Sequence, residues 1–426
     1  MTDTYKKFTE LISWIKCNGG TTTGTTIYKC SEQERGVFSS KRIKANKSIV
    51  RIPRSLIIHD GMGQESYYGR QLLRAPHSDI HNLQISLVVI FMLEDMRNGR
   101  HFIPYYNILP EQFGNFPIFW DNKVLTLLKG SDMLNKIKQR THSFVNDYKV
   151  IARCCEGFQE EYSFKEFLFL RLLVGSRNFG IRIDGIKRVA MVPFSDMLNH
   201  AANPNTNWHY DNNKSQFIMK VNEIIPRNSE LTDTYGNKCN SQMLLFYGFA
   251  LPNNKYNQLS ISIRQRGRRT RSEQKKVSLY YELNGKLRKG FKDSFAHDML
   301  TFLRISAANE SELNRFKYRR DYSKPVTIRN EIEMLQLLYN YMTTFTENYI
   351  LDLKKITELI HNIDKNSQEY LVLLLIQGEL EIIQFYIDFS IYMISFLKRK
   401  ELPPKDKYVE YTNKLNNLRR VAIAEK

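Results

Sequence analysis

The chain has 426 residues, with 63 Lys or Arg against 44 Asp or Glu, so its formal net charge is +19. Its 42% hydrophobic and 25% charged residues are typical of a folded globular protein and exclude wholesale disorder. The longest apolar run, Ile85–Leu93, has nine residues including Ser86, fewer than half of the roughly 20 that cross a bilayer, so we expect no membrane span. The first residues lack the apolar core of a signal peptide, and we expect a cytoplasmic or nuclear protein.

The five cysteines form no C-x-x-C pair, and their number is odd. A disulfide framework pairs an even number of cysteines, and a cysteine-rich zinc site uses closely spaced pairs. We therefore expect a reducing compartment and no metal.

Up to residue 263 the patterns predict short strands with helices between them. Strands are expected at 48–53 and 188–193, which have short β-rich patterns, and at 216–221 and 258–264, where apolar and polar residues alternate. Helices are expected at 85–97, 122–138 and 163–174. This half of the chain is therefore predicted to mix strands with a mostly helical insert.

Basic residues concentrate between residues 264 and 329, where 18 Lys or Arg face 7 Asp or Glu, a net charge of +11. The densest part is Arg264–Lys276, which no apolar residue interrupts up to its end. Such a run is usually a solvated linker, because like charges repel and bury poorly. The alternative is a docking patch for a ribosomal, RNA-associated or acidic partner, and both interpretations stay open.

After the basic run the pattern is helical throughout. The segment 331–360 places Leu335, Leu338 and Met342 at three- and four-residue steps, as one side of a helix does. A second long helix is expected at 367–399, divided near Gly378, and Pro403-Pro404 ends it.

Two motifs carry the most chemical information. Asn199-His200 is followed by Pro204-Asn205 in the pattern N-H-x-x-x-P-N. About thirty residues later come E-L-T-x-x-Y, ending at Tyr235, and then Phe246-Tyr247-Gly248-Phe249. The order and spacing of these motifs make coincidence a poor explanation.

In these motifs the sequence resembles the SET-domain methyltransferases, in the branch typified by the Rubisco large-subunit lysine methyltransferase. The resemblance implies an α+β chain: a β-rich SET fold with a knot-like active site, interrupted by a helical insert and followed by an all-helical substrate-binding domain. The implied segments are residues 1–75 and 188–263 for the SET domain, 76–187 for the insert, 264–277 for a basic linker and 278–426 for the helical domain. Arg35-Gly36-Val-Phe38 and Val50–Pro53 resemble the first strand pair of that fold. Gly378-Glu379 resembles a landmark of its C-terminal domain.

The same resemblance implies S-adenosylmethionine as cofactor and Tyr235 as the catalytic tyrosine beside the methyl group and the amine. Arg177 is expected to pair with the cofactor's carboxylate, as suits a forked guanidinium. Phe179 and Tyr247 are expected to wall the substrate channel. The complete set of expected cofactor-binding residues is Gln33, Glu34, Arg35, Arg177, Asp196, Met197, Leu198, Asn199, His200, Tyr247, Gly248 and Phe249. Asp196 to Leu198 are expected in the same strand segment as Asn199.

One position departs from the family pattern. The first loop usually reads G-x-G, but here Glu34 replaces the first glycine and only Gly36 remains. A residue with a side chain is strained at positive φ, so a weaker cofactor affinity is expected if the loop keeps that conformation.

We expect protein-lysine methylation of a non-histone protein by a monomeric enzyme. A lysine amine has a pKa of about 10.4 and reacts only when neutral, which an apolar, aromatic-walled channel favours. Two alternatives stay open: a protein-histidine methyltransferase of the actin-modifying type, and a non-catalytic module that binds acidic or nucleic-acid partners. In the histidine enzymes the residue two after the cofactor arginine is a small amide, whereas here it is Phe179.

Overall fold

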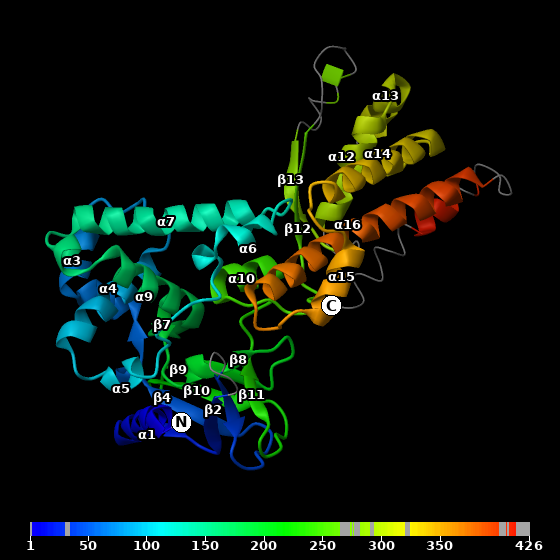
Figure 1. Cartoon of the computed structure of the whole chain (residues 1–426). Helices are drawn as coiled ribbons and strands as arrows, with labels where there is room; N and C mark the ends of the chain where they lie inside the picture. The colour runs from blue at the N-terminus through cyan, green and yellow to red at the C-terminus, as the bar shows by residue number, and fades with distance from the viewer. Residues whose placement is uncertain are drawn as a thin grey trace. The chain divides into compact units, whose positions relative to one another are not determined.

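The computed structural model describes residues 2–29, 35–264, 273–274, 276, 282–289, 294–319, 324–399, 406 and 409–414. The chain forms two compact units, one of residues 1–114 and 137–237, the other of residues 115–136 and 238–426 (Figure 1). Gln33, Glu34 and most of the basic run Arg264–Lys276 lie outside the described residues. The division into five segments stays a prediction.

The first unit holds three sheets, with strand orders β1-β4-β10-β9, β2-β3-β11-β8 and β5-β7-β6. Their strands are β1 (Thr21–Thr22), β2 (Thr25–Lys29), β3 (Arg35–Ser39), β4 (Ser48–Pro53), β5 (Ile58–His59), β6 (Asn178–Ile183), β7 (Ile186–Met191), β8 (Asn199–His200), β9 (Thr206–Asp211), β10 (Gln216–Val221) and β11 (Glu230–Asp233). All described neighbours are antiparallel except β11 and β8, which are parallel.

The first unit also contains helices. They are α1 (Thr2–Cys17), α2 (Asp60–Glu65), α3 (Tyr67–Arg74), α4 (Leu83–Asn98), α5 (Ile103–Tyr106), α8 (Phe158–Glu161), α9 (Phe164–Arg177) and most of α7 (Met133–Cys154). The start of α9 is encoded locally, because Ser163 and Glu166 form a capping box in which each side chain binds the other's backbone N–H. This fixes where α9 begins and, one helix length later, where Arg177 stands.

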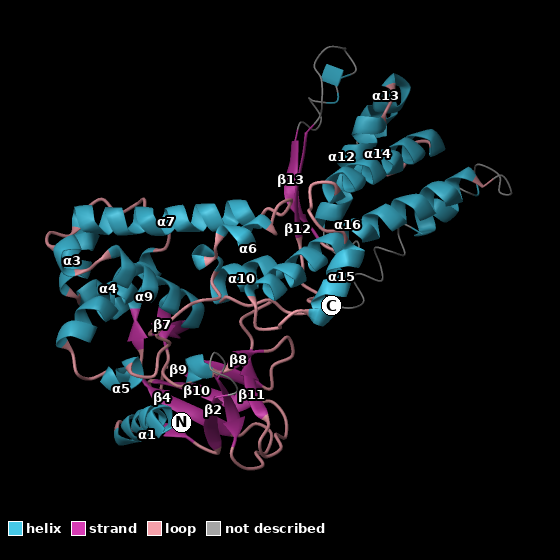
Figure 2. Cartoon of the chain, viewed as in Figure 1, coloured by secondary structure: helices cyan, strands magenta, loops and turns pink. Residues whose placement is uncertain are grey.

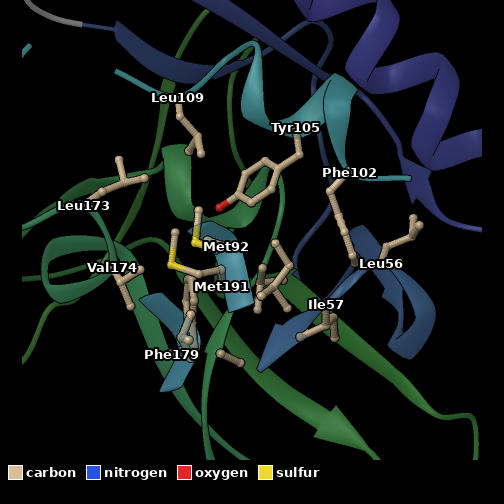
Figure 3. Packing of buried hydrophobic residues seen from close by; sticks show 14 of the residues in the cluster. Leu56, Ile57, Met92, Phe102, Tyr105, Leu109, Leu173, Val174, Phe179 and Met191 are labelled. Atoms are coloured by element: carbon tan, nitrogen blue, oxygen red, sulfur yellow. The ribbon is translucent and has the colours of Figure 1, made fainter. Parts of the chain in front are cut away.

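The core of the first unit is continuous from α1 to β11. On β10, Phe217, Ile218 and Met219 are buried, and Phe217 pairs in register with Ile52 of β4. Figure 3 shows part of this cluster, with Phe102 and Tyr105 of the α5 region beside side chains from α4 and α9. The sheets that carry the motif residues therefore rest on a rigid apolar base.

The second unit is mainly helical and contains one hairpin (Figure 2). Its elements are α6 (Asn122–Thr126), α10 (Asn240–Tyr247), β12 (Leu259–Arg264), β13 (Glu282–Leu287), α12 (Ser294–Ala307), α13 (Glu310–Arg319), α14 (Ile328–Thr346), α15 (Leu353–Asn362) and α16 (Gln368–Lys398). The predicted helical C-terminal region is confirmed in outline, but β13 lies in a segment predicted to be helical throughout. Its alternate residues Leu283 and Leu287 are buried, because β13 pairs with the strictly alternating β12.

Two predicted helices are wrong as single elements. The segment 122–138 breaks at Gly130, whose φ of +96° is a conformation that suits glycine and ends a helix. The segment 331–360 is divided between α14 and α15, because Asp352 caps α15 by accepting a hydrogen bond from the Lys355 N–H.

Conversely, the predicted division near Gly378 is absent, and α16 continues through it. A Cβ at Gly378 would lie 2.0 Å from the Asn257 amide nitrogen, so the glycine serves close packing rather than a break. Among the described helices, α16 alone is long and apolar enough to cross a membrane, but 67% of its apolar window is buried, as in a core helix.

A buried carboxyl lies at the centre of the second unit. Glu379 on α16 is 3% exposed and accepts hydrogen bonds from the Ser131 hydroxyl and the Tyr349 hydroxyl, each at 3.0 Å. Burial raises the pKa of Glu379 to about 7, although both hydroxyls and Lys136 act in the opposite direction. The carboxyl therefore ties three segments of this unit together.

Two smaller predictions are corrected in the first unit. The segments at Arg35–Phe38 and Val50–Pro53 are not a strand pair: β3 pairs with β2 and β11, whereas β4 pairs with β1 and β10. Asp196 and Met197 lie in a short 3-10 helix, Ser195–Met197, rather than in the strand of Asn199. The turn brings Asp196 back beneath Val192, whose carbonyl accepts its N–H.

Candidate active site

The two motifs found in the sequence meet as neighbouring parallel strands. Asn199 of β8 pairs with Thr232 of β11, and His200 pairs with Asp233. The Ala201 N–H extends this pairing by donating to the Asp233 carbonyl at 2.9 Å. The residues predicted from N-H and E-L-T-x-x-Y therefore share one edge of the sheet.

Asn205, the last residue of the first motif, fastens the second motif in place. Its amide nitrogen donates to the Glu230 carbonyl at 2.8 Å, and its amide oxygen accepts from the Thr232 N–H at 2.9 Å. The Thr206 hydroxyl also donates to the Thr232 carbonyl at 2.8 Å. An asparagine side chain has both a hydrogen-bond donor and an acceptor. Asn205 therefore binds one backbone carbonyl and one backbone N–H of β11, as a neighbouring strand would.

Asn199 joins the start of β3 to this pair of strands. Its amide donates to the Arg35 carbonyl at 3.0 Å and to the Glu230 carboxylate at 2.8 Å. A Cβ at Gly36 would lie 2.7 Å from that carboxylate and 3.3 Å from the Asn199 amide, so a larger residue here would displace these two side chains.

Tyr235 is held at both its backbone and its hydroxyl. The hydroxyl donates to the Leu198 carbonyl at 2.9 Å, and the Tyr235 N–H donates to His200 Nδ1 at 3.0 Å. The two rings lie 5.3 Å apart. Because Nδ1 accepts a hydrogen bond, it carries no proton, and the neutral His200 ring has its N–H at Nε2. The tyrosine oxygen therefore has a fixed position.

A second group of polar side chains comes from the end of α9, from α5 and from the segments around Asp196 and Arg35. Arg177, at the end of α9, donates to the Asp196 carbonyl at 2.8 Å and lies 3.5 Å from its carboxylate. The Tyr105 hydroxyl, inside the apolar cluster of Figure 3, donates to the same carboxylate at 2.9 Å. Arg35 donates to the Ile108 carbonyl.

Burial controls the charges of this group. It raises the pKa of Asp196, and the nearby Arg177 and Arg35 guanidinium groups oppose the rise. Burial, assisted by repulsion from Arg177, lowers the pKa of Arg35 to about 10, so the guanidinium stays charged at neutral pH. Burial also raises the pKa of Tyr105, which keeps its proton for Asp196.

Several buried polar atoms in this group have no hydrogen-bond partner among the described residues: Arg35 Nη2, Arg177 Nε and Asp196 Oδ1. Two guanidinium donors and one carboxylate acceptor complement a carboxylate and an ammonium group. The amino-acid end of S-adenosylmethionine carries both, so these residues fit it.

Phe179 lies on β6, two residues after Arg177, and is 9% exposed. Its ring meets the edges of Trp208 and Phe217 at 5.3 and 5.2 Å. Asp233 is buried with them, and its pKa is raised to about 6 by burial, with the Trp208 side chain opposing the rise. This side of the site is therefore an aromatic wall.

The remaining predicted residues are placed as follows. Met197 and Leu198 are 3% and 1% exposed in the core of the first unit. Tyr247 ends α10 in the second unit, Gly248 follows it at a φ of +78°, and the Phe249 ring lies 6.1 Å from that of Tyr247. Their roles at the cofactor and in the channel stay predictions.

Two family models match this chain. The SET domain model covers residues 34–236, and the Rubisco LSMT substrate-binding model covers residues 263–383. The first match contains both motifs and the paired strands that carry them. The chain belongs to the SET-domain methyltransferase family. Methyltransferases of this family use S-adenosylmethionine, whose amino-acid end fits the buried polar group described above.

Characterised relatives of this SET protein are distant in sequence. Ribosomal lysine N-methyltransferase set10 of Schizosaccharomyces pombe is 22% identical over 44% of the chain and 35% of its own length. An actin-histidine N-methyltransferase of Gallus gallus is 21% identical over 60% of the chain and 44% of its own length. The chain thus spans about a third to a half of the length of these relatives.

A solved structure of Rubisco LSMT bound to sinefungin and monomethyllysine has the same fold as this SET protein. The TM-score is 0.74 at 18% identity, over 93% of this chain and 94% of the other. The fold match thus extends through both units.

Sequence reasoning missed two residues of the site. Tyr105, which orients Asp196, lies in the segment Pro104–Pro110, where neither spacing nor residue type points to a role in the site. Asn205 belongs to the first motif, but its contacts with β11 depend on the tertiary path of the chain, which sequence spacing does not express.

Proposed function

We propose that this SET protein is an S-adenosylmethionine-dependent protein-lysine N-methyltransferase that acts on a non-histone protein. The observation that carries the proposal is the fixed hydroxyl of Tyr235, bonded to the Leu198 carbonyl beside the Asn199-His200 strand. When bound, S-adenosylmethionine supplies a methyl group activated by its sulfonium. Every other requirement falls on the protein: holding the cofactor, orienting the amine and excluding water.

Arg177, Arg35 and Asp196 are proposed to hold the amino-acid end of the cofactor. The free guanidinium N–H groups bind its carboxylate, and Asp196 Oδ1 accepts from its ammonium group. Tyr105 keeps Asp196 in place from the apolar side. Since these groups are already rigid and desolvated, little reorganisation accompanies binding.

Tyr235 is proposed to orient the amine of the substrate. Its proton is engaged with Leu198, and a hydroxyl oxygen that donates one hydrogen bond can also accept one, here from the N–H of an incoming amine. His200, through the Tyr235 N–H, keeps the tyrosine backbone in register. Holding an amine at a fixed angle is a large part of what methyl transfer requires.

The aromatic wall supports lysine as the methylated residue. Phe179 offers a buried ring edge and no hydrogen-bond donor or acceptor, so it cannot orient an imidazole nitrogen. An apolar surface also disfavours the charged form of an amine and so favours the neutral, reactive one.

Histidine methylation is the second candidate. Its support is the relatives themselves, because an actin-histidine N-methyltransferase of Papio anubis matches 95% of this chain at 19% identity. The two candidates differ in the atom modified, which mass spectrometry reads directly.

The deciding experiment incubates the purified chain with labelled S-adenosylmethionine and a cell extract, and identifies the labelled protein and residue. A Tyr235→Phe sample serves as the matched blank. Methyl-lysine that appears only with the unmodified chain supports the proposal. Methyl-histidine would favour the second candidate, and no label in any protein would refute both.

A further inference from the structure

Helix α13 presents two faces of opposite character. Its inner side carries Leu313 and Phe316, which are 2% and 0% exposed and pack with Ile305, Ala308 and Val326. Its outer side carries Ser311, Asn314, Arg315 and Tyr318, spaced three and four residues apart as one stripe of a helix. Figure 1 shows α13 beside α12 in the second unit.

Two acidic residues flank Ser311 at the start of this stripe: Glu310 is exposed, whereas Glu312 does not contribute to the outer surface. Glu312 is 3% exposed, and its carboxylate accepts hydrogen bonds from the Arg329 guanidinium and from the Asn309 N–H at 2.9 Å. The Arg329 group neutralises it. The positive charge of Arg315 is therefore not cancelled by Glu312.

The outer stripe lines a shallow, open hollow. Tyr318 is 92% exposed there, the highest value among the large hydrophobic side chains that the structure describes. Within the described part of the chain, neither Arg315 nor Tyr318 has an ion-pair or hydrogen-bond partner. An aromatic ring so fully exposed contributes little to the stability of the fold.

We propose that the outer face of α13, formed by Ser311, Asn314, Arg315 and Tyr318, binds single-stranded RNA. The Tyr318 ring offers a stacking face for a base, and Arg315 offers a guanidinium for a phosphate. Asn314 and Ser311 add donors and acceptors for sugar and base edges. The sequence segment that contains α13, residues 264–329, has a net charge of +11, and a polyanion complements a net positive charge.

An acidic protein segment explains less of this surface. Protein interfaces are centred on buried apolar and aromatic anchors with a polar rim. Among the described residues that line the hollow there is no aliphatic side chain, and the single aromatic ring stands exposed rather than in a pocket. A stacking ring beside a cation is the usual arrangement for unpaired nucleotides.

The test measures fluorescence anisotropy of a labelled single-stranded RNA of about 12 nucleotides with the full chain. No cofactor is added, so the result does not depend on methyl transfer. The variants are Tyr318→Ala, Tyr318→Phe and Arg315→Gln. Tyr5→Ala is the matched control, because Tyr5 is a tyrosine 75% exposed on α1 in the other unit.

We expect Y318A to weaken RNA binding about 5- to 100-fold, as the loss of one base stack does, whereas Y318F and Y5A bind like the unmodified chain. R315Q should reduce the slope of log affinity against log salt by about one. Unchanged RNA binding in Y318A would overturn the proposal. So would binding of an acidic peptide such as polyglutamate, in preference to RNA, that needs Arg315 but not Tyr318.

Discussion

The hydroxyl of Tyr235 and the backbone carbonyl of Leu198 are joined by a hydrogen bond of 2.9 Å. This bond links the end of one motif to the residue just before the other. It also orients the hydroxyl, because the proton points at Leu198 and the lone pairs point elsewhere. The consequences of this arrangement and of three others are testable.

Removing the hydroxyl should abolish most methyl transfer. Tyr235→Phe keeps the ring beside His200 but loses the oxygen that orients the amine, and we expect the turnover number to fall about 100-fold or more. Cofactor affinity, measured by calorimetry, should stay within a factor of about three, because the cofactor's polar end is held by other residues. Tyr210→Phe, on β9, is the control and should keep full turnover. Equal turnover in Tyr235→Phe would contradict the role.

Arg177 should be needed as an arginine. Arg177→Lys keeps the charge but loses the planar guanidinium, which can donate to the Asp196 carbonyl and to a ligand at the same time. Cofactor affinity should therefore fall about 10-fold or more. Arg182→Lys on β6, where the arginine donates to the Gly185 carbonyl, should change nothing. Calorimetric titration with S-adenosylhomocysteine compares the two, and equal affinities would show that Arg177 does not hold the ligand.

Asn205 should contribute to the stability of the first unit. Asn205→Ala leaves the Thr232 N–H and the Glu230 carbonyl without their partner, which should lower the free energy of unfolding by about 2 kcal/mol. Asn213→Ala, at an exposed turn residue, should cost almost nothing. Urea unfolding of both variants decides. A loss in Asn205→Ala no larger than in the control would mean that water replaces the lost bonds.

The stability of the second unit should depend on pH through Glu379. Because burial raises its pKa to about 7 from 4.5, the folded state keeps a proton that the unfolded chain releases. The stabilisation from the protonated carboxyl is complete below pH 4.5 and is lost as pH rises through 7, by roughly 3 kcal/mol in total.

Thermal melts between pH 4.5 and 8 measure this effect. Glu379→Gln should remove that part of the pH dependence, whereas Glu358→Gln, at an exposed carboxylate on α15, should retain it. Parallel curves for the unmodified chain and Glu379→Gln would refute the assignment.

The sequence carried much of this fold in local patterns. The predicted strand 48–53 coincides with β4, and the predicted helix 163–174 agrees with α9 because its capping box is encoded in adjacent residues. Periodicity missed β13, whose pairing with β12 crosses a long connection, and it misread Gly378, where the approach of Asn257 decides the outcome. The helix breaks at Gly130 and Asp352 depend on single residues, whereas the apolar periodicity around them predicts uninterrupted helices.

The site shows the same division between local and long-range information. The motif residues Asn199, His200 and Tyr235 were named from their order, and the structure brings them together. The link from Tyr105 to Asp196 joins residues 91 positions apart and is set by tertiary packing. Residue type alone indicates that a buried carboxylate needs a donor, but it does not say which hydroxyl supplies it.

The sheet order β2-β3-β11-β8 has a consequence for how the protein is made. Ser39 and Ser229, which bond across β3 and β11, are 190 residues apart in the chain. A ribosome adding about 5 to 20 residues per second needs roughly 10 to 40 seconds to cover that distance. During this time the β2–β3 hairpin has an open edge, the kind of surface on which nascent chains aggregate. We therefore expect chaperones to bind the nascent chain at this edge during translation, and this binding should end when β11 emerges from the ribosome.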